Sequence, residues 1–323
     1  MRPDWDFLLE RDDMPRGLWP VEWLTIAYCA ITSILLIVQW PLLHHPETMV
    51  VQRATIILCT MAVWGFYTLQ PMRMVTFARI TMQMGLLAYW YPETYEFNCT
   101  FANLDHVFAG LDASLFGCQP SITFSQLCPW GWFSEALNMG YFAYYPMIAL
   151  VMFYYFFRCN VHYERASFVV MCSFFIYYLI YIRVPVAGPQ FYFVAVDPAD
   201  VAAARFPELG TYFAQHTEML TAPGNADGLF YGLVHSAQEA GERPTAAFPS
   251  SHIGITFILL YLTYPRSRKL FAVLLPITLL LTLATVYIQA HYLVDAIAGV
   301  ISSVVVYLAS DRLFSRIVAR RHA

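Results

Sequence analysis

Long apolar runs separated by short polar segments dominate the pattern along the chain. A helix that crosses a bilayer needs about 20 predominantly apolar residues. The pattern predicts about eight such spans, near residues 19–42, 52–70, 74–92, 137–157, 167–187, 251–265, 269–288 and 292–310. The run at 74–92 is the weakest, because Arg79 and Gln83 interrupt it, and a helix lying flat at the interface also fits. We therefore expect an all-α, polytopic membrane protein.

Two long connections separate these runs. Residues 93–136 mix aromatic and polar positions, as in FANLDHVFAGLDASLFG, which is typical of short helices lying in the membrane interface. Residues 188–248 form the second connection and contain an amphipathic stretch, PADVAAARFPELGTYFAQH. Loops this long in a compact protein are usually functional or disordered. The pattern indicates one domain, with interfacial helices between its spans.

Composition agrees with a membrane protein and excludes a nucleic-acid partner. Hydrophobic residues make up 59% of the 323 residues and charged residues only 12%, against about 25% charged in a soluble domain. The net charge is −4, and the chain has no basic stripe for a nucleic-acid backbone. The N-terminal segment is too acidic for a signal peptide, and the apolar stretch after it is longer than a cleavable one. We expect that stretch to be retained as the first span.

The arginines and the one lysine predict the orientation. With eight spans, the basic positions fall on one side of the membrane, namely Arg73, Arg79, Arg158, Arg165, the turn at 266–269 and the tail at 316–321. Basic loops favour the cytoplasmic side. Both termini are then cytoplasmic, and only Arg53 disagrees.

The seven cysteines give no clear pairing. Cys99, Cys118 and Cys128 share one polar segment, and the remaining four do not form a C-x-x-C pair with them or with each other. One disulfide within this trio is possible, but an odd number of cysteines does not specify which two would pair.

Two polar motifs lie at the N-terminal ends of apolar runs. AFPSSH ends at His252, where the span at 251–265 begins, and HYLVD begins at His291, before the span at 292–310. The predicted topology places both on the same face of the membrane. His291 and Asp295 are four residues apart, which puts them on one helix face, so that the carboxylate can accept the imidazole N–H.

Phosphate chemistry is what such an arrangement suits. Placing polar side chains in membrane helices costs free energy, so the ones that occur there tend to be functional. Helix N-termini present N–H groups to anions, and Ser250 and Ser251 would stand beside them. A neutral imidazole could attack phosphorus while a protonated one supplies the proton that the leaving oxygen needs. The motifs contain no cluster with metal-ligand spacing, so we expect neither a metal nor another cofactor.

The two motifs together resemble those of the phosphatidic acid phosphatase type 2 superfamily of membrane lipid phosphatases and phosphotransferases. Pro249, Ser250 and His252 match its P-S-x-H motif, and His291 and Asp295 match the end of the next motif. The resemblance implies His291 as the nucleophile, Asp295 as its orienting carboxylate and His252 as the acid. It also implies a six-helix core, here residues 72–323, preceded by extra spans in residues 1–71.

The chain departs from the superfamily pattern at two cations. Thr285 stands six residues before the nucleophile, where the phosphatases have arginine, and Gln190 follows Gly188 and Pro189 where related members have Gly-Pro-Arg. Fewer cations favour a phosphodiester, with one negative charge, over a monoester with up to two. Arg183 or Arg243 could compensate, although Arg243 fits equally well as a solvated loop charge.

Among the branches, the motifs are most similar to those of the inositol phosphorylceramide synthases of fungi and their bacterial relatives. That resemblance implies a membrane phospholipid donor and a lipid alcohol acceptor such as ceramide, with the site on the non-cytoplasmic face. Two other functions stay open, namely a lipid phosphatase in which water replaces the acceptor, and a transporter or scaffold without turnover. The sequence does not specify the oligomeric state.

Overall fold

The computed structural model describes residues 5–12 and 15–321. Every regular element in these residues is a helix, apart from one isolated bridge between Arg11 and Met72, which confirms the predicted all-α fold. Residues 1–4 and 13–14 of the predicted N-terminal region, and residues 322–323 after the basic tail, lie outside this description.

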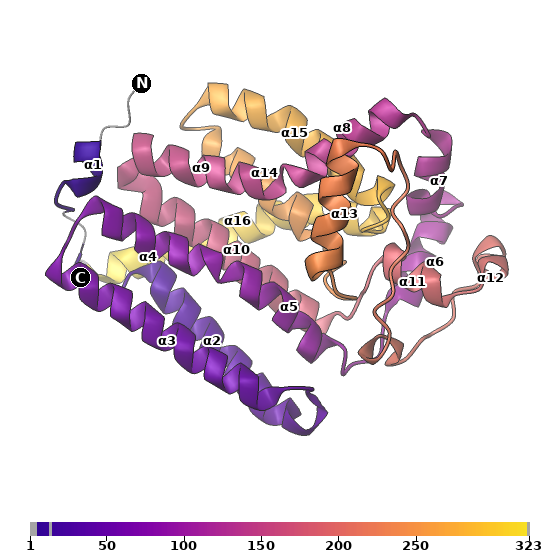
Figure 1. The fold of residues 1–323 in the computed structure, drawn as a ribbon, viewed down its shortest axis with the longest axis horizontal. Helices are drawn as coiled ribbons and strands as arrows, with labels where there is room; N and C mark the ends of the chain where they lie inside the picture. Colours follow the sequence, from indigo (N-terminus) through magenta and orange to yellow (C-terminus); the bar gives the residue numbers. More distant parts are fainter. Residues whose placement is uncertain (1–4, 13–14, 322–323) are drawn as a thin grey trace.

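The first third of the chain forms a helical hairpin followed by a broken helix (Figure 1). In chain order its elements are α1 (Trp5–Leu9), α2 (Pro20–Gln39), the 3-10 helix η1 (Trp40–Leu42), α3 (Pro46–Leu69), α4 (Arg73–Gly85) and α5 (Leu87–Asn98). The hairpin of α2 and α3 packs on α4, and α2 also packs on the later helix α10. The predicted boundary after residue 71 stays a prediction.

Helix α10 (Tyr163–Arg183) forms the centre of the molecule. It packs against α2, α5, α9 (Tyr144–Arg158), α14 (Ser251–Thr263) and α16 (Leu293–Arg321). Its side chains are apolar on every face, as expected of a helix that is surrounded by others. Four hydroxyls along it, those of Ser167, Ser173, Tyr178 and Tyr181, donate to backbone carbonyls and so cost little to bury.

The last three long helices carry the two histidine motifs. Helix α14 packs on α15 (Arg268–Tyr287) and on α16, and α15 packs on α8 (Gly131–Phe142). Gly299 of α16 faces the start of α14, and a Cβ there would lie 2.8 Å from the carbonyl oxygen of Ser250. A residue without a side chain therefore allows the two motif-bearing helices to approach closely.

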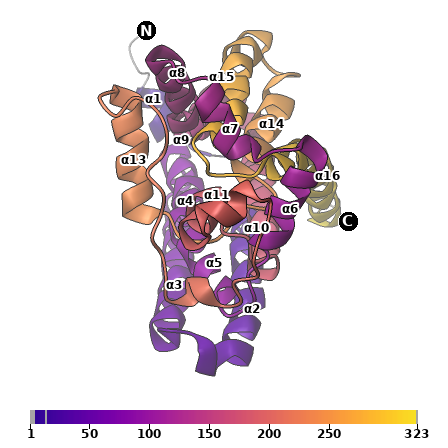
Figure 2. The ribbon, with the colours of Figure 1, turned by 90° about the vertical axis from the view of Figure 1, so that its right-hand side faces the viewer.

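Short helices gather at the end of the molecule opposite the two chain termini (Figures 1 and 2). They are α6 (Asp105–Phe116), α7 (Pro120–Leu127), α11 (Pro189–Ala195) and α12 (Pro198–Ala202), together with η3 (Tyr212–Ala214). Helix α13 (Leu229–Gly241) packs along α8, while η2 (Asn160–His162) joins α9 to α10. Short helices thus occur in both predicted connections.

The predicted number of eight spans is not confirmed. Five helices of the described residues are long and apolar enough to cross a membrane, and six if α8 and α9, bent by 45°, form one span. Helix α14 is apolar but has only 13 residues. The run predicted at 74–92 is broken between α4 and α5, and α4 has a polar side that buries Arg79 and Gln83.

Buried ion pairs account for the charges within the first helices. Arg79 of α4 contacts Glu22 of α2 at 2.5 Å, with its guanidinium between the rings of Trp19 and Tyr67. Arg53 of α3, which disagreed with the predicted orientation, pairs with Glu93 of α5 at 2.7 Å. Since it is buried against a carboxylate, Arg53 is a packing residue and carries no information about orientation.

The cysteine trio forms no disulfide. All seven cysteines have free thiols, and of the trio Cys99 is buried, Cys118 is exposed and Cys128 is intermediate.

Candidate active site

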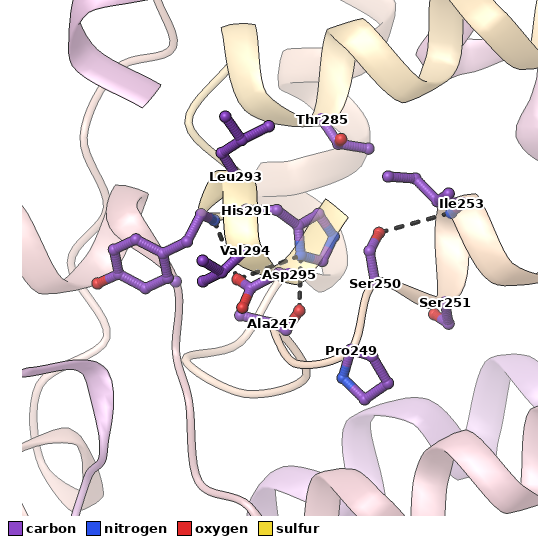
Figure 3. A network of polar contacts seen from close by, with 12 residues as sticks. Ala247, Pro249, Ser250, Ser251, Ile253, Thr285, His291, Leu293, Val294 and Asp295 are labelled. Carbon is purple, nitrogen blue, oxygen red and sulfur yellow. Dashed lines mark hydrogen bonds and ion pairs between the residues drawn. The ribbon is translucent and has the colours of Figure 1, made fainter. Parts of the chain in front are cut away.

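The first motif turns into helix α14 at Ser250. The hydroxyl of Ser250 accepts a hydrogen bond from the N–H of Ile253, which caps the helix N-terminus. Tyr181 of α10 also holds this turn. Its hydroxyl accepts from the N–H of Ser251 at 2.9 Å and donates to the carbonyl of Pro249 at 3.0 Å. Figure 3 shows Ser250 next to the imidazole of His291, with Pro249 and Ser251 farther from that ring.

The second motif places His291 in the loop between α15 and α16. Its Nδ1 lies 2.7 Å from the carbonyl oxygen of Ala247, in the segment just before the first motif. A carbonyl only accepts, so Nδ1 carries the proton and Nε2 keeps its lone pair. The same Nδ1 is 3.9 Å from Asp295 Oδ2 (Figure 3). The prediction that Asp295 accepts this hydrogen bond is therefore wrong. The acceptor of the imidazole N–H is the carbonyl of Ala247.

Asp295 lies fully buried one helical turn after His291. Its Oδ2 accepts from the N–H of Tyr292 at 3.0 Å, and its Oδ1 has no hydrogen-bond partner among the described residues. Its backbone carbonyl accepts the N–H of Ser250 at 3.2 Å, which ties the two motifs together. The Asp295 carboxyl thus lies near the imidazole without a hydrogen bond to it, and it caps the start of α16.

Two strained residues flank the histidine loop. Ala246 has a φ of 69° and Gln289 a φ of 65°, in the left-handed region that non-glycine residues rarely adopt. Ala246 precedes the carbonyl that holds His291, and Gln289 lies two residues before the histidine. Such conformations cost about 1–3 kcal/mol each and gather at functional sites. Both residues lie close in the chain to the two groups of the contact between the Ala247 carbonyl and the imidazole of His291.

His252 lies in an aromatic slot beside His291. Its ring packs on Tyr141 and Tyr144, with centroids 4.8 and 4.3 Å apart, and its centroid is 6.0 Å from that of His291. The structure therefore brings together the two histidines that the motifs predicted would meet, and both tyrosines, from α8 and α9, are additions that the sequence analysis did not make.

Burial keeps the predicted nucleophile neutral. His291 is 4% exposed, and its burial lowers the pKa of the imidazole to about 4, although the Ala247 hydrogen bond acts in the opposite direction. At neutral pH the ring is therefore uncharged, which is the state in which Nε2 can attack phosphorus.

Two neighbouring cavities, which share part of their lining, adjoin the histidines. A hollow of about 10 Å³ touches both, and a chamber of about 370 Å³ touches His252 but not His291. Their shared lining residues are Tyr91, Tyr141, Glu242, Ser251 and His252. The chamber is walled by α5, α8, α9, α10 and α13. Among the residues that the structure describes, no arginine or lysine lines either cavity, and Glu242 is the one carboxyl in the lining.

Two aspartates of α6 that the sequence analysis missed hold the loops of the site. Asp105 is fully buried and accepts from the N–H groups of Ala187 and Gly188, at 2.7 and 2.8 Å, and from the hydroxyl of Tyr292 at 3.0 Å. It thereby links the residue after His291 to the connection that follows α10. Its burial raises the pKa of the carboxyl, and the hydrogen bonds from backbone and side chains act against that.

Asp112 does the same for the start of α16. Its two oxygens accept from the N–H groups of Leu293 and Val294, at 2.9 and 3.0 Å. Asp105 and Asp112 are seven residues apart, so they face the same side of an otherwise apolar helix. That spacing within LDHVFAGLD is the signal that could have identified them.

The remaining predicted residues lie behind or outside the cavities. Gln190 is buried and its side-chain oxygen accepts from Gln238, which lines the chamber. Gly188, two residues earlier, allows this segment to lie on the histidine loop, because a Cβ there would be 2.7 Å from the Ala290 carbonyl. Thr285 is buried, and its carbonyl accepts the N–H of His291 at 3.0 Å.

Neither candidate for a compensating cation reaches the cavities. Arg183 is exposed at the end of α10, with its guanidinium 5.5 Å from the ring centre of Phe101. Arg243 is also exposed, and it donates to the carbonyl of its neighbour Glu242. Their predicted contacts with phosphate stay predictions, and in this structure both side chains lie away from His291.

Comparison with known proteins identifies the family. A sequence model of the PAP2 superfamily, whose full name is phosphatidic acid phosphatase type 2, matches residues 106–309 and so includes both histidine motifs. No curated protein and no solved structure matches the chain significantly. Members of the superfamily are generally enzymes that act on phosphate esters, which supports a lipid phosphatase or phosphotransferase function in general. With its several apolar helices, the chain is an integral membrane protein that belongs to the PAP2 superfamily.

Proposed function

We propose that the protein transfers a phospho-head group from a glycerophospholipid to a lipid alcohol, through a phosphohistidine on His291. The observation that carries the proposal is the charge of the site. Both histidines line the same hollow. Within residues 5–12 and 15–321, no arginine or lysine lines the hollow or the chamber, whereas the carboxyl of Glu242 lines both.

Charge decides between a diester and a monoester substrate. A lipid phosphate monoester carries up to two negative charges near neutral pH, whereas a diester carries one. Each charge-assisted hydrogen bond to a phosphate is worth about 1.5–3 kcal/mol, so a site without guanidinium groups binds the dianion poorly. The half-buried carboxyl of Glu242 would, when ionised, repel the second charge as well. These two effects favour a phosphodiester donor.

The first step forms the phosphohistidine. The Nε2 lone pair of His291 attacks phosphorus as the bond from phosphorus to the diacylglycerol oxygen breaks, and His252 gives that oxygen a proton. The Ala247 carbonyl keeps the Nδ1 proton in place, and the Asp295 carboxylate stabilises the positive charge that the ring gains. The hollow is smaller than a phosphate group, so this end of the site must open when the donor binds.

The second step reverses the roles. The acceptor hydroxyl attacks phosphorus, His252 takes its proton, and the bond from phosphorus to His291 breaks. His252 becomes the acid only with a phosphate beside it, because that anion offsets the cost of a buried imidazolium. The faces of Tyr141 and Tyr144 also attract a cation.

The similarity of the motifs to those of inositol phosphorylceramide synthases supports a phosphoinositol-like head group and ceramide as the acceptor. The aromatic chamber next to His252 is compatible with the lipid end of such an acceptor.

The test is a comparison of substrates with purified protein in mixed micelles. Labelled phosphatidylinositol is offered with and without ceramide, and labelled phosphatidic acid is offered separately. We expect a ceramide-dependent labelled product and little phosphate release. Faster turnover of phosphatidic acid, with inorganic phosphate released in the absence of any acceptor, would overturn the transferase proposal and leave a phosphatase.

We also propose that the site faces the non-cytoplasmic side of the membrane, because the basic 266–269 turn and the basic tail lie at the other end of the chain's long helices. In a background with the exposed Cys59 and Cys118 replaced by serine, Glu218→Cys should react with an impermeant thiol reagent in intact cells. Lys269→Cys should resist it. The reverse pattern would place the site in the cytosol.

A further inference from the structure

The two cavities suit different parts of the substrate, the phosphate group and the lipid alcohol. In an in-line displacement the leaving group stands opposite the nucleophile. The hollow touches His291, so phosphorus belongs there, and the chamber touches His252, the residue that serves the leaving oxygen. The chamber is therefore the place of the lipid alcohol, first as the departing diacylglycerol and then as the incoming acceptor.

The walls of the chamber suit a lipid. Its lining includes aromatic and aliphatic side chains of α9, α10 and α13, among them Tyr145, Phe174, Tyr178 and Val234. Polar groups are concentrated at the end that adjoins the hollow. The alcohol's reactive head would lie at this polar end, with its chains directed along the apolar walls.

Glu242 stands at the junction of the two cavities. It follows the last turn of α13, where its N–H donates to the Gln238 carbonyl at 2.8 Å, and its carboxyl lines both the hollow and the chamber. Tyr91 of α5 donates its hydroxyl to Glu242 Oε1 at 2.8 Å, which fixes the carboxyl in place. The mechanism proposed above assigns this carboxyl no proton to move.

A fixed carboxylate can distinguish the two lipid alcohols. When ionised it only accepts hydrogen bonds, with about four lone-pair sites, and Tyr91 occupies one of them. Diacylglycerol carries two ester groups beside its hydroxyl, and esters only accept. A sphingoid-type alcohol carries an amide N–H and a second hydroxyl next to the reacting one, and both can donate to a carboxylate.

We propose that Glu242 is a specificity-determining residue that selects acceptor alcohols carrying a second hydrogen-bond donor beside the reacting hydroxyl, and so discriminates them from diacylglycerol. This rests on the proposed transfer reaction. Because diacylglycerol gains nothing from the carboxyl, the selection favours forward transfer over return of the head group to diacylglycerol.

The ionisation of the carboxyl is compatible with a nearby phosphate. Burial raises the pKa of Glu242 to about 7, while the hydrogen bond from Tyr91 and the charge of Arg243 act against that rise. At neutral pH the carboxyl therefore carries only part of a negative charge, and a monoanionic diester can be bound next to it.

The test compares two acceptors with one head-group donor. Transfer to ceramide and exchange into labelled diacylglycerol are measured as kcat/KM for the wild type, Glu242→Gln and Glu242→Leu. Glu239→Gln, on the exposed side of α13, is the matched control. We expect Glu242→Leu to lower the ratio of the two values about tenfold or more, through KM for ceramide, since one hydrogen bond to a charged group is lost. Glu242→Gln should lower this ratio less, because the amide oxygen of glutamine can still accept a hydrogen bond from ceramide.

A donor-free acceptor completes the cycle. An analogue with an ester in place of the amide and without the second hydroxyl should be a poor acceptor for the wild type, and Glu242→Leu should make it no poorer. An unchanged ratio in Glu242→Leu would overturn the inference, and so would an equal fall of both activities, which would indicate a structural role. A wild type that transfers to neither alcohol would instead overturn the proposed function, and the inference with it.

Discussion

The N-terminal helices and the catalytic end of the molecule bury ionisable groups in different ways. Between α2 and α5 each buried guanidinium that the structure describes faces a carboxylate, as Arg79 faces Glu22 and Arg53 faces Glu93. At the catalytic end, Asp112 is held by backbone N–H groups, Asp105 by backbone N–H groups together with the side chains of Asn103 and Tyr292, and His291 by a carbonyl.

The difference separates packing from chemistry. A buried ion pair is balanced, and breaking it leaves an uncompensated charge in an apolar environment. An imidazole held only by a carbonyl has no fixed opposite charge within hydrogen-bond distance, and burial keeps it neutral. The neutral ring can therefore bond to a phosphoryl group and take on the positive charge that this bond creates. A side chain that is already part of an ion pair would have to give up its partner to react in this way.

The largest effect is expected from the nucleophile. His291→Ala should lower kcat by about 10⁴-fold or more, on the scale of losing a member of a catalytic triad. Its unfolding temperature should stay close to that of the wild type, since the lost Ala247 contact is a single hydrogen bond. Near-wild-type kcat in a preparation free of host enzyme would exclude a phosphohistidine at this position.

Arg79→Met should break the fold rather than the chemistry. It leaves the fully buried Glu22 without its partner, and removing one member of a buried pair costs about 3–5 kcal/mol. Thermal unfolding in detergent should show this loss, whereas Arg205→Met, in an exposed pair with Asp200, should change little. The double variant Glu22→Leu with Arg79→Met should recover stability. If Arg79→Met kept its stability and lost kcat, the division between the two regions would be wrong.

Asp295→Asn should have a smaller effect on kcat than His291→Ala. Replacing a triad carboxylate costs about 10⁴-fold where it alone fixes the histidine tautomer. Here the Ala247 carbonyl fixes the tautomer, and Asp295 is 3.9 Å away. What is lost is the charge that stabilises the imidazolium, so we expect a fall of about 10–100-fold, or roughly 1.4–2.8 kcal/mol. A loss as large as that of His291→Ala would mean that Asp295 takes over the hydrogen bond during turnover.

The pH dependence gives the smallest predicted difference. Because burial lowers the pKa of His291 to about 4, the imidazole stays neutral as the pH falls, until protonation near that value removes the lone pair. In Glu242→Gln, where the carboxyl that lines both cavities is absent, kcat/KM should show no decline between neutral pH and about 5, because His252, the proposed acid, gains its proton as the pH falls. It should decline only below that, near the pKa of His291. A decline centred near 6.5, the ordinary value for histidine, would contradict the buried position of the ring.

The sequence allowed the fold class, the family and both histidines to be predicted, because these depend on long apolar runs and on short motifs. It led to the wrong acceptor for the His291 N–H, since Ala247 is 44 residues away along the chain and helical spacing pointed to the nearer Asp295. Asp105 and Asp112 were missed for the same reason, because their partners lie far away along the chain. The count of eight spans was not confirmed. In the run at 74–92, for example, one face carries Arg79, which is buried against other helices instead of facing lipid.

The central claim, a covalent intermediate on His291 formed from a diester donor, is tested most directly by exchange without an acceptor. Labelled diacylglycerol is incubated with the purified protein and unlabelled phosphatidylinositol, with ceramide absent. A two-step mechanism predicts that label enters phosphatidylinositol and that His291→Ala abolishes this exchange, as in other ping-pong reactions. Ceramide-dependent transfer by the wild type without any such exchange would contradict the intermediate and indicate direct transfer between the two lipids.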